Sequence, residues 1–327
     1  MTLMTRPGTC LCMVAALTLT AAAPAAGPLT TRPDDFEQFW QRSAAQRTSL
    51  APSTLKGTCA GAVMFPVTET DQAQAHYWPG GPPGVLTPIV YLYEPDGPAL
   101  CSPAGAGRAH LSLPWRDGAG PLHEWYLDGL PDRDAASLRR AVLTACQAVD
   151  LVRTCPSVQA PRVGLIGDGF GATVALAAAA LMPEQAAFLI AHQPRPAYHC
   201  LPDGALTSCP AVRDVLARIK SERPPGSHGT ISRTLRYFDA INFAPLVKAP
   251  TLFIAGDADR EAPLPELLQL YDCLLCEREL IVLEGLGHCA SASLPIFPDL
   301  VRRWLARVEG GRVPTACDDS PSWLTSP

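Results

Sequence analysis

Charge of either sign is sparse in this chain. Only 17% of its 327 residues are Asp, Glu, Lys or Arg, and the formal net charge is −5. No basic run stands out, so the sequence lacks the electrostatic footprint of a nucleic-acid-binding protein. Internal repeats and low-complexity linkers are also absent from the sequence. We therefore expect no nucleic-acid partner and one folded domain rather than a repeat array.

Apolar runs of about 20 residues, the length that crosses a membrane, are missing too. Residues 10–23 are continuously apolar or small, Arg6 precedes them, and residues 23–26 offer small side chains for cleavage. This pattern is typical of a signal peptide. The run is too short and too rich in Ala and Thr to favour a membrane-spanning helix, and no cysteine follows it in the position of a lipid anchor. We expect a signal peptide over 1–26, no stable membrane anchor, and a secreted or periplasmic protein.

Cysteine, by contrast, is frequent. The chain has 12 cysteines, and all but two follow the predicted leader. An even number in an exported chain favours disulfides, although sequence does not fix their connectivity. The short separations make Cys146–Cys155 and Cys200–Cys209 candidate pairs.

Four residues allow an alternative interpretation as zinc ligands, namely Cys273, Cys276, His288 and Cys289. Both residues between the first two cysteines are leucine, and no loop chemistry frames the pair. Structural zinc sites normally have such a frame, so we expect neither a metal ion nor another cofactor.

Apolar strand-like segments alternate with helical patterns through most of the chain. Two short strands are predicted between 57 and 78, followed by strands at 88–93, 108–113, 162–166, 187–191, 250–256 and 279–283. Helices are predicted from about residue 33, over 135–152, after residue 171, over 264–273 and over 299–308. We expect a long polar loop at 114–134, an irregular segment at 192–230 and a loose tail from about 310. This alternation predicts an α/β domain over 27–327, with a mostly parallel central sheet and helices on both faces.

One strand-to-helix connection carries the strongest functional signal. The apolar strand from Arg162 ends in Gly167-Asp168-Gly169-Phe170-Gly171, and an alanine-rich helix follows. This is the layout of a nucleophile elbow, Gly-x-Ser-x-Gly, in which small flanking residues let the strand and helix approach closely. Gly169 stands where the attacking serine would be. Glycine supplies neither oxygen nor sulfur for a covalent acyl intermediate.

Two further residues follow later strands in the order that α/β-hydrolases use. Asp259 comes after the strand at 250–256, and His288 comes after the strand at 279–283. An acid that orients a histidine completes the catalytic set behind a nucleophile. Each residue alone is weak evidence, because an Asp after a strand is often a helix cap. Their order and shared position at strand ends predict one site.

The chain resembles the acetyl xylan esterase / cephalosporin C deacetylase family of α/β-hydrolases. The resemblance is carried by residues 32–40, 138–150, the elbow and, most strongly, 233–250. It implies an α/β-hydrolase fold and a serine carboxylesterase that acts on small acetyl esters or acetylated saccharides.

The same resemblance implies roles for individual residues. The family's acid falls on Asp259 and its histidine on His288, while Tyr93 and the backbone N–H of Phe170 match the oxyanion donors. Family members carry Ser at Gly169 and usually Gln at Phe170. They commonly form ring-like homo-oligomers. The loop after Tyr93 is typically glycine-rich in the family and reads Glu94-Pro95-Asp96 here, so the resemblance leaves a homo-oligomer open for this chain.

Three functional interpretations follow. The first is a pseudoenzyme that binds an acetylated saccharide or a protein partner. The second is an active ester hydrolase that uses water or an unusual nucleophile; Asp168 is disfavoured for that role because it lies one residue from the elbow position. The third is a dinucleotide-binding protein, since Gly167, Gly169 and Ala172 fit a Rossmann glycine pattern. That pattern requires an acid at the end of the next strand, and residues 190–194 contain none.

If the rest of the site is intact, Gly169→Ser should create or greatly raise hydrolysis of p-nitrophenyl acetate. The reason is that the substitution returns the missing oxygen to an otherwise suitable elbow. Spectrophotometric assay of both proteins side by side checks this. An unchanged rate would show that the site differs from a working esterase at more than Gly169.

Overall fold

The structure is a computed structural model that describes most of the chain after the predicted leader. The described residues are 30–48, 60–69, 71–80, 87–93, 108–116, 122–154, 158, 161–195, 210, 213–214, 217–218, 221, 227–288 and 297–310. The predicted signal peptide, the candidate Cys200–Cys209 pair, most of the irregular segment and the tail from 311 lie outside them.

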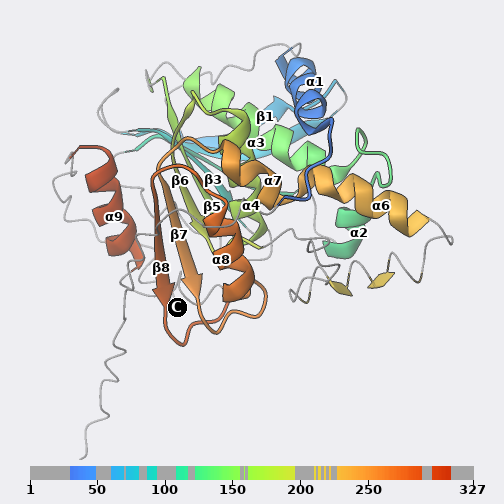
Figure 1. Ribbon diagram of the computed structural model, residues 1–327. Helices are drawn as coiled ribbons and strands as arrows, with labels where there is room; N and C mark the ends of the chain where they lie inside the picture. The colour runs from blue at the N-terminus through green and yellow to red at the C-terminus, as the bar shows by residue number, and fades with distance from the viewer. Residues whose placement is uncertain are drawn as a thin grey trace, which may run out of the picture.

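One eight-stranded sheet organises the described residues (Figure 1). Its strands are β1 (Gly61–Pro66), β2 (Gln72–Trp78), β3 (Ile89–Tyr93), β4 (His110–Pro114), β5 (Val163–Asp168), β6 (Ala186–His192), β7 (Thr251–Gly256) and β8 (Arg278–Leu283). Their spatial order is β1-β2-β4-β3-β5-β6-β7-β8. β2 pairs antiparallel with both β1 and β4, and all other neighbours are parallel. The predicted mostly parallel α/β sheet is therefore confirmed.

Helices cover both faces of this sheet. They are α1 (Phe36–Thr48), α2 (Leu122–Leu127), α3 (Ser137–Arg153), α4 (Phe170–Leu181), α6 (Ser227–Leu235), α7 (Ala240–Phe243), α8 (Leu264–Asp272) and α9 (Phe297–Val308), with single 3-10 turns at Arg236–Phe238 and Ala244–Leu246. α9 packs Val301, Trp304 and Leu305 on one face of the sheet. The second buried cluster joins the other face to α1, α3, α4, α7 and α8. Figure 1 shows the same division, with α9 set apart from the other helices.

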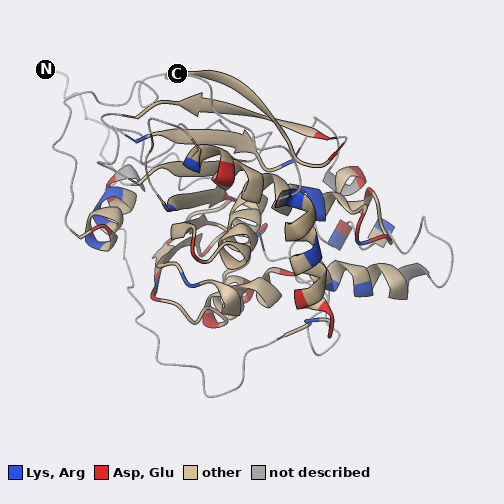
Figure 2. Cartoon of the chain, turned by 90° about the horizontal axis from the view of Figure 1, so that it is seen from above, with Lys and Arg blue, Asp and Glu red and all other residues tan. Residues whose placement is uncertain are grey.

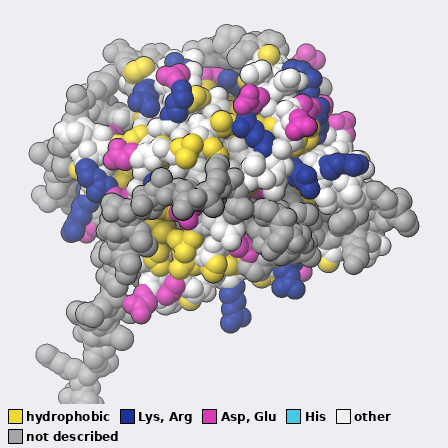
Figure 3. All heavy atoms as spheres, viewed as in Figure 1, with side chains coloured by type: hydrophobic (Ala, Val, Ile, Leu, Met, Phe, Trp, Pro, Cys, Tyr) yellow, Lys and Arg dark blue, Asp and Glu magenta, His cyan; other side chains and the backbone are white. Residues whose placement is uncertain are grey.

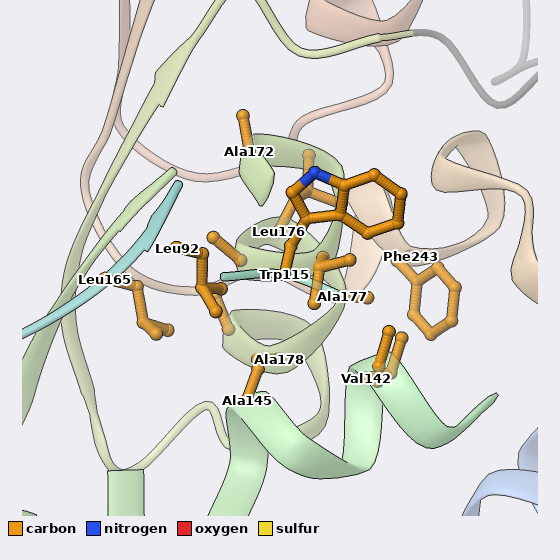
Figure 4. Close-up of a cluster of buried hydrophobic side chains, with 14 of the residues drawn as sticks. Leu92, Trp115, Val142, Ala145, Leu165, Ala172, Leu176, Ala177, Ala178 and Phe243 are labelled. Atoms are coloured by element: carbon orange, nitrogen blue, oxygen red, sulfur yellow. The ribbon is translucent and has the colours of Figure 1, made fainter. Parts of the chain in front are cut away.

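Helix α4 is buried along nearly its whole length. Figure 4 shows its small side chains, among them Ala177 and Ala178, between Leu92 and Leu165 of the sheet and Val142 and Ala145 of α3. Eleven of its 12 residues are buried. Alanine adds little volume, so α4 can lie close to both neighbours while still removing apolar surface from water. This close packing fixes the position of the turn at its N-terminus.

Charged side chains of both signs lie mainly on the helices and connecting segments, and the strands carry few (Figure 2). On the face shown in Figure 3, basic and acidic side chains are interspersed rather than grouped by sign. In the described residues, no helix is both long enough and apolar enough to cross a membrane.

The structure corrects the prediction of a long polar loop at 114–134. Helix α2 lies within it and places Trp125 edge-on against Trp115, with ring centroids 4.8 Å apart. Tyr126 is buried 6.0 Å from the Phe170 ring. Six residues have little helical stability of their own, so these tertiary aromatic contacts stabilise α2.

The candidate Cys146–Cys155 disulfide also needs correction, because Cys146 is a free, buried thiol on α3. Its side chain packs in the core cluster, and burial raises the pKa of the thiol to about 11. Cys146 therefore acts as a small apolar side chain. Cys155 lies outside the described residues.

Gly171→Ala should destabilise the fold. A Cβ at Gly171 would lie 2.3 Å from the carbonyl oxygen of Leu92, so strand β3 and helix α4 would have to separate. We expect the free energy of unfolding to fall by about 1–3 kcal/mol, as for other overpacked sites, measured by urea denaturation. Gly229→Ala is the matched control, because its Cβ would meet nothing within 4 Å. Equal stability of the two variants would contradict the close approach.

Candidate active site

The elbow backbone has the strained conformation that presents a nucleophile. β5 ends at Asp168, and Gly169 joins it to α4 with φ of 56° and ψ of −122°. A Cβ at Gly167 would lie 2.4 Å from the Cα of Ala172, which explains the small residue at that flank. A residue with a side chain at Gly169 would be strained by about 1–3 kcal/mol, and glycine avoids this strain. The elbow is therefore intact in its backbone and lacks only the side chain.

Asp259 and His288 meet at the carboxyl end of the sheet. His288 Nδ1 lies 2.9 Å from Asp259 Oδ2, across the turns that follow β7 and β8. The other carboxylate oxygen accepts hydrogen bonds from the backbone N–H groups of Glu261 and Ala262, at 2.8 and 3.0 Å. Burial raises the pKa of Asp259, but the hydrogen bonds from His288 and the backbone outweigh it and hold this pKa below its ordinary value. The carboxylate therefore stays ionised and orients the imidazole.

The loop that carries His288 is pinned at several points. Gly285 has φ of 73° and donates its N–H to Asp257 Oδ1 at 2.6 Å. Gln193 Nε2 donates to the carbonyl oxygen of Gly287 at 2.9 Å. Gln193 itself has φ of 46°, an uncommon conformation for a residue with a side chain. These hydrogen bonds hold the loop that carries His288 against the ends of β6 and β7. The sequence alone did not single out Gln193.

Arg195 is a second residue that the sequence alone did not reveal. Its Nη2 atom lies 3.2 Å from Nε2 of His288, the ring nitrogen opposite Asp259. Its backbone N–H donates to the carbonyl oxygen of Gly169 at 3.2 Å. The hydroxyl of Thr173 donates to the carbonyl oxygen of Arg195 at 2.6 Å. The guanidinium also lies over the Phe170 ring, 5.4 Å from its centroid.

The two residues matched to oxyanion donors lie beside the elbow. Tyr93 ends β3, the strand next to β5, and Leu92 pairs with Gly167 in that register. Tyr93 is half-buried, and burial raises the pKa of its hydroxyl. Phe170 begins α4, and its buried ring packs 5.1 Å from Trp115. Both residues thus lie, like Gly169, at the carboxyl ends of the parallel strands.

Asp168 does not take over the nucleophile position. Its side chain is buried, and Oδ1 lies 2.5 Å from Nδ1 of His192 on the neighbouring strand β6. The carboxylate therefore faces His192 rather than the ring of His288.

For the zinc alternative, the described residues contain no group of three His, Cys, Asp or Glu side chains that could hold a metal ion. Cys276 is a free thiol, half-buried beside the hydroxyl of Thr251. Cys289 lies outside the described residues.

With this geometry in place, the comparison with known families is informative. The family described as "Acetyl xylan esterase (AXE1)" matches residues 118–307, which include the elbow, Asp259 and His288. This chain belongs to the acetyl xylan esterase family. The match confirms the resemblance drawn from the sequence.

Solved structures place the fold among the α/β-hydrolases. The chain is similar to acetyl xylan esterase 1 from Thermoanaerobacterium sp. JW/SL YS485, with a TM-score of 0.67, 19% identity, and coverage of 86% of this chain and 95% of that chain. It is also similar to an acetyl xylan esterase from Paenibacillus sp. R4, with a TM-score of 0.66, 20% identity, and coverage of 86% and 96%. The α/β hydrolase GrgF from Penicillium sp. sh18 matches with a TM-score of 0.52 and 19% identity over 77% of this chain and 99% of that chain. These similarities show a shared α/β-hydrolase fold.

Asp259→Asn should reduce the amount by which the free energy of unfolding falls at acid pH. The folded-state pKa of Asp259 is lowered, so its carboxylate adds to the free energy of unfolding above the unfolded-state pKa of about 3.9. That contribution is lost as the pH falls through the folded-state pKa. Urea denaturation between about pH 6 and pH 3 should show a larger loss in the wild type than in the variant.

His288→Ala removes one of the hydrogen bonds to Asp259 and should give an intermediate acid profile. Equal acid losses in wild type and Asp259→Asn would contradict the hydrogen bonds assigned to this carboxylate.

Proposed function

We propose that this protein is a catalytically degenerate acetyl xylan esterase-like hydrolase that binds an acetylated saccharide or a small acetyl ester. The observation that carries this proposal is the Asp259–His288 pair, held at 2.9 Å beside an elbow whose central residue is Gly169. Two parts of a triad are in place and the attacking atom is missing.

The missing atom determines what chemistry is left. In a working triad, serine attacks the ester carbonyl while histidine takes its proton, and an acyl-enzyme forms. His288 has no hydroxyl group at the elbow to deprotonate. Removing a triad nucleophile leaves only ~10³–10⁴-fold catalysis over water, far below the level of an intact triad. Binding is therefore the function that the retained frame favours.

The buried surroundings of the site are consistent with retention for binding. The close-packed elbow glycines, the buried carboxylate of Asp259 and the hydrogen-bonded loop that carries His288 support this proposal. An acetyl group presented to this edge of the sheet would meet the N-terminus of α4 and the half-buried Tyr93. The predicted signal peptide supports an exported protein that meets such saccharides outside the cytoplasm.

A second candidate function is residual ester hydrolysis through a bound water. The intact hydrogen bond between His288 and Asp259 favours it, because an oriented imidazole can act as a general base toward water. This mechanism requires His288 Nε2 to accept a proton during the reaction.

Ester hydrolysis by the wild type and by His288→Ala distinguishes the two functions. We expect both proteins to hydrolyse p-nitrophenyl acetate and acetylated xylan at the same low rate. Isothermal titration calorimetry should show binding of acetylated xylo-oligosaccharides and weaker binding of the deacetylated forms. Rapid hydrolysis by the wild type that His288→Ala abolishes would overturn the proposal in favour of a working esterase.

A further inference from the structure

The ring nitrogen of His288 that should face a nucleophile faces an arginine instead. In a serine-histidine-acid site, one ring nitrogen bonds the acid and the other bonds the serine hydroxyl. Here Nδ1 bonds Asp259, and Nε2 lies 3.2 Å from Nη2 of Arg195. We propose that Arg195 is a second block on this site, independent of Gly169, because its guanidinium takes the position of the nucleophile hydroxyl at His288. The inference rests on the proposed degenerate function and extends it to another residue.

The backbone of Arg195 is held on the elbow itself. Its N–H donates to the carbonyl oxygen of Gly169, and its carbonyl oxygen accepts from the hydroxyl of Thr173, on the first turn of α4. The side chain is mostly buried, with 14% of its surface exposed. Its guanidinium lies over the Phe170 ring at 5.4 Å. Arg195 therefore reaches His288 from a backbone position that is fixed relative to Gly169.

The chemistry of the guanidinium opposes catalysis at His288. Arginine has five N–H donors, no acceptor, and a charge that persists at all accessible pH values. Its hydrogen bond to Nε2 requires that nitrogen to be an acceptor, so the ring proton lies on Nδ1, toward Asp259. A general base must take a second proton and become imidazolium, and a neighbouring cation disfavours that form.

Two carboxylates of the described residues also lie near the imidazole and the guanidinium. Asp259 is the carboxylate in direct contact with the imidazole. Glu261 Oε2 lies 4.0 Å from Nη1 of Arg195 on the opposite side of the guanidinium. Arg195 therefore contacts the same nitrogen that would accept the nucleophile's proton.

This arrangement means that returning the hydroxyl is not enough to restore an esterase. A serine introduced at Gly169 would have to displace Arg195 from Nε2 before His288 could accept its proton. We expect restoration to require Gly169→Ser together with removal of the guanidinium. The two substitutions should therefore be strongly non-additive, as expected for groups that share one hydrogen-bond partner.

The test compares four full-length proteins: wild type, Gly169→Ser, Arg195→Ala and the double variant. A fluorophosphonate probe reports an activated serine by mass spectrometry of the labelled protein. The introduced serine oxygen attacks phosphorus and forms an O–P bond, fluoride leaves with the electrons of the P–F bond, and the hydroxyl proton passes to His288 Nε2. We expect the double variant to react about 100-fold faster than Gly169→Ser, the lower range of general-base contributions. Hydrolysis of p-nitrophenyl acetate should follow the same ranking.

Two controls separate this effect from charge or folding changes. Arg260→Ala removes an exposed cation next to Asp259 and should give no gain in the Gly169→Ser background. Arg195→Met keeps an unbranched apolar stem without the charge or the donors, and it should replace Arg195→Ala if that variant melts early by circular dichroism.

Equal labelling rates for Gly169→Ser and either folded double variant would overturn the role of Arg195. The hydrolysis rate of the wild type tests the proposed degenerate function separately, because it contains no introduced serine. High wild-type activity that depends on His288 would contradict that function, whereas the ratio of double to single variant decides the role of Arg195.

Discussion

The close approach of helix α4 to strands β3 and β5 is the constraint on which the site depends. No Cβ fits at Gly167 or Gly171, since each would meet backbone atoms at less than 2.5 Å. The chain therefore turns sharply at Gly169, with φ of 56°. The alanine-rich α4 makes this possible, because its small side chains pack closely against the sheet and α3 (Figure 4). The backbone therefore places whichever residue occupies position 169 at the carboxyl end of β5, above the sheet.

Around this fixed turn, the structure brings a carboxylate, an imidazole and a guanidinium together. The acid-imidazole pair has Asp259 ionised, with three hydrogen bonds from His288 and two backbone N–H groups. The other ring nitrogen of the imidazole lies beside the guanidinium of Arg195. In the proposed arrangement, a neutral imidazole bonds a carboxylate and a guanidinium without any proton transfer. A catalytic triad, by contrast, must move a proton onto the imidazole. In the function that we propose, Gly169 and the position of Arg195 therefore both oppose turnover.

Sequence reasoning predicted the parts of this structure that depend on local patterns. The strand-elbow-helix unit and the helix at 299–308 each rest on residues within a few positions of one another. Asp259 and His288 were each identified from the strand directly before them. Helix α2 could not be predicted in this way, because Trp125 and Tyr126 are stabilised by Trp115 and Phe170, which lie on other elements. Cys146 lies within the helix predicted over 135–152, and its spacing from Cys155 suggested a disulfide, but the structure buries it in the core as a free thiol.

The role of Arg195 could not be predicted from the sequence, for a different reason. It follows a strand by three residues, in a segment with no periodic pattern, and nothing in its neighbours indicates where its side chain points. Its direction is set by two backbone hydrogen bonds, to Gly169 and from Thr173, that exist only after β6 and α4 are side by side. Gln193 is similar, since its contact with Gly287 spans two strand ends.

The most direct test of this account is the protonation and bonding of His288 in the wild-type protein, measured by nitrogen-15 NMR of the imidazole ring near neutral pH. We expect a neutral ring with its proton on Nδ1 and with Nε2 as a hydrogen-bond acceptor, shifted toward the free-acceptor value in Arg195→Ala. A proton on Nε2, or an Nε2 signal that does not respond to Arg195→Ala, would contradict the placement of Arg195 at the position of the missing nucleophile.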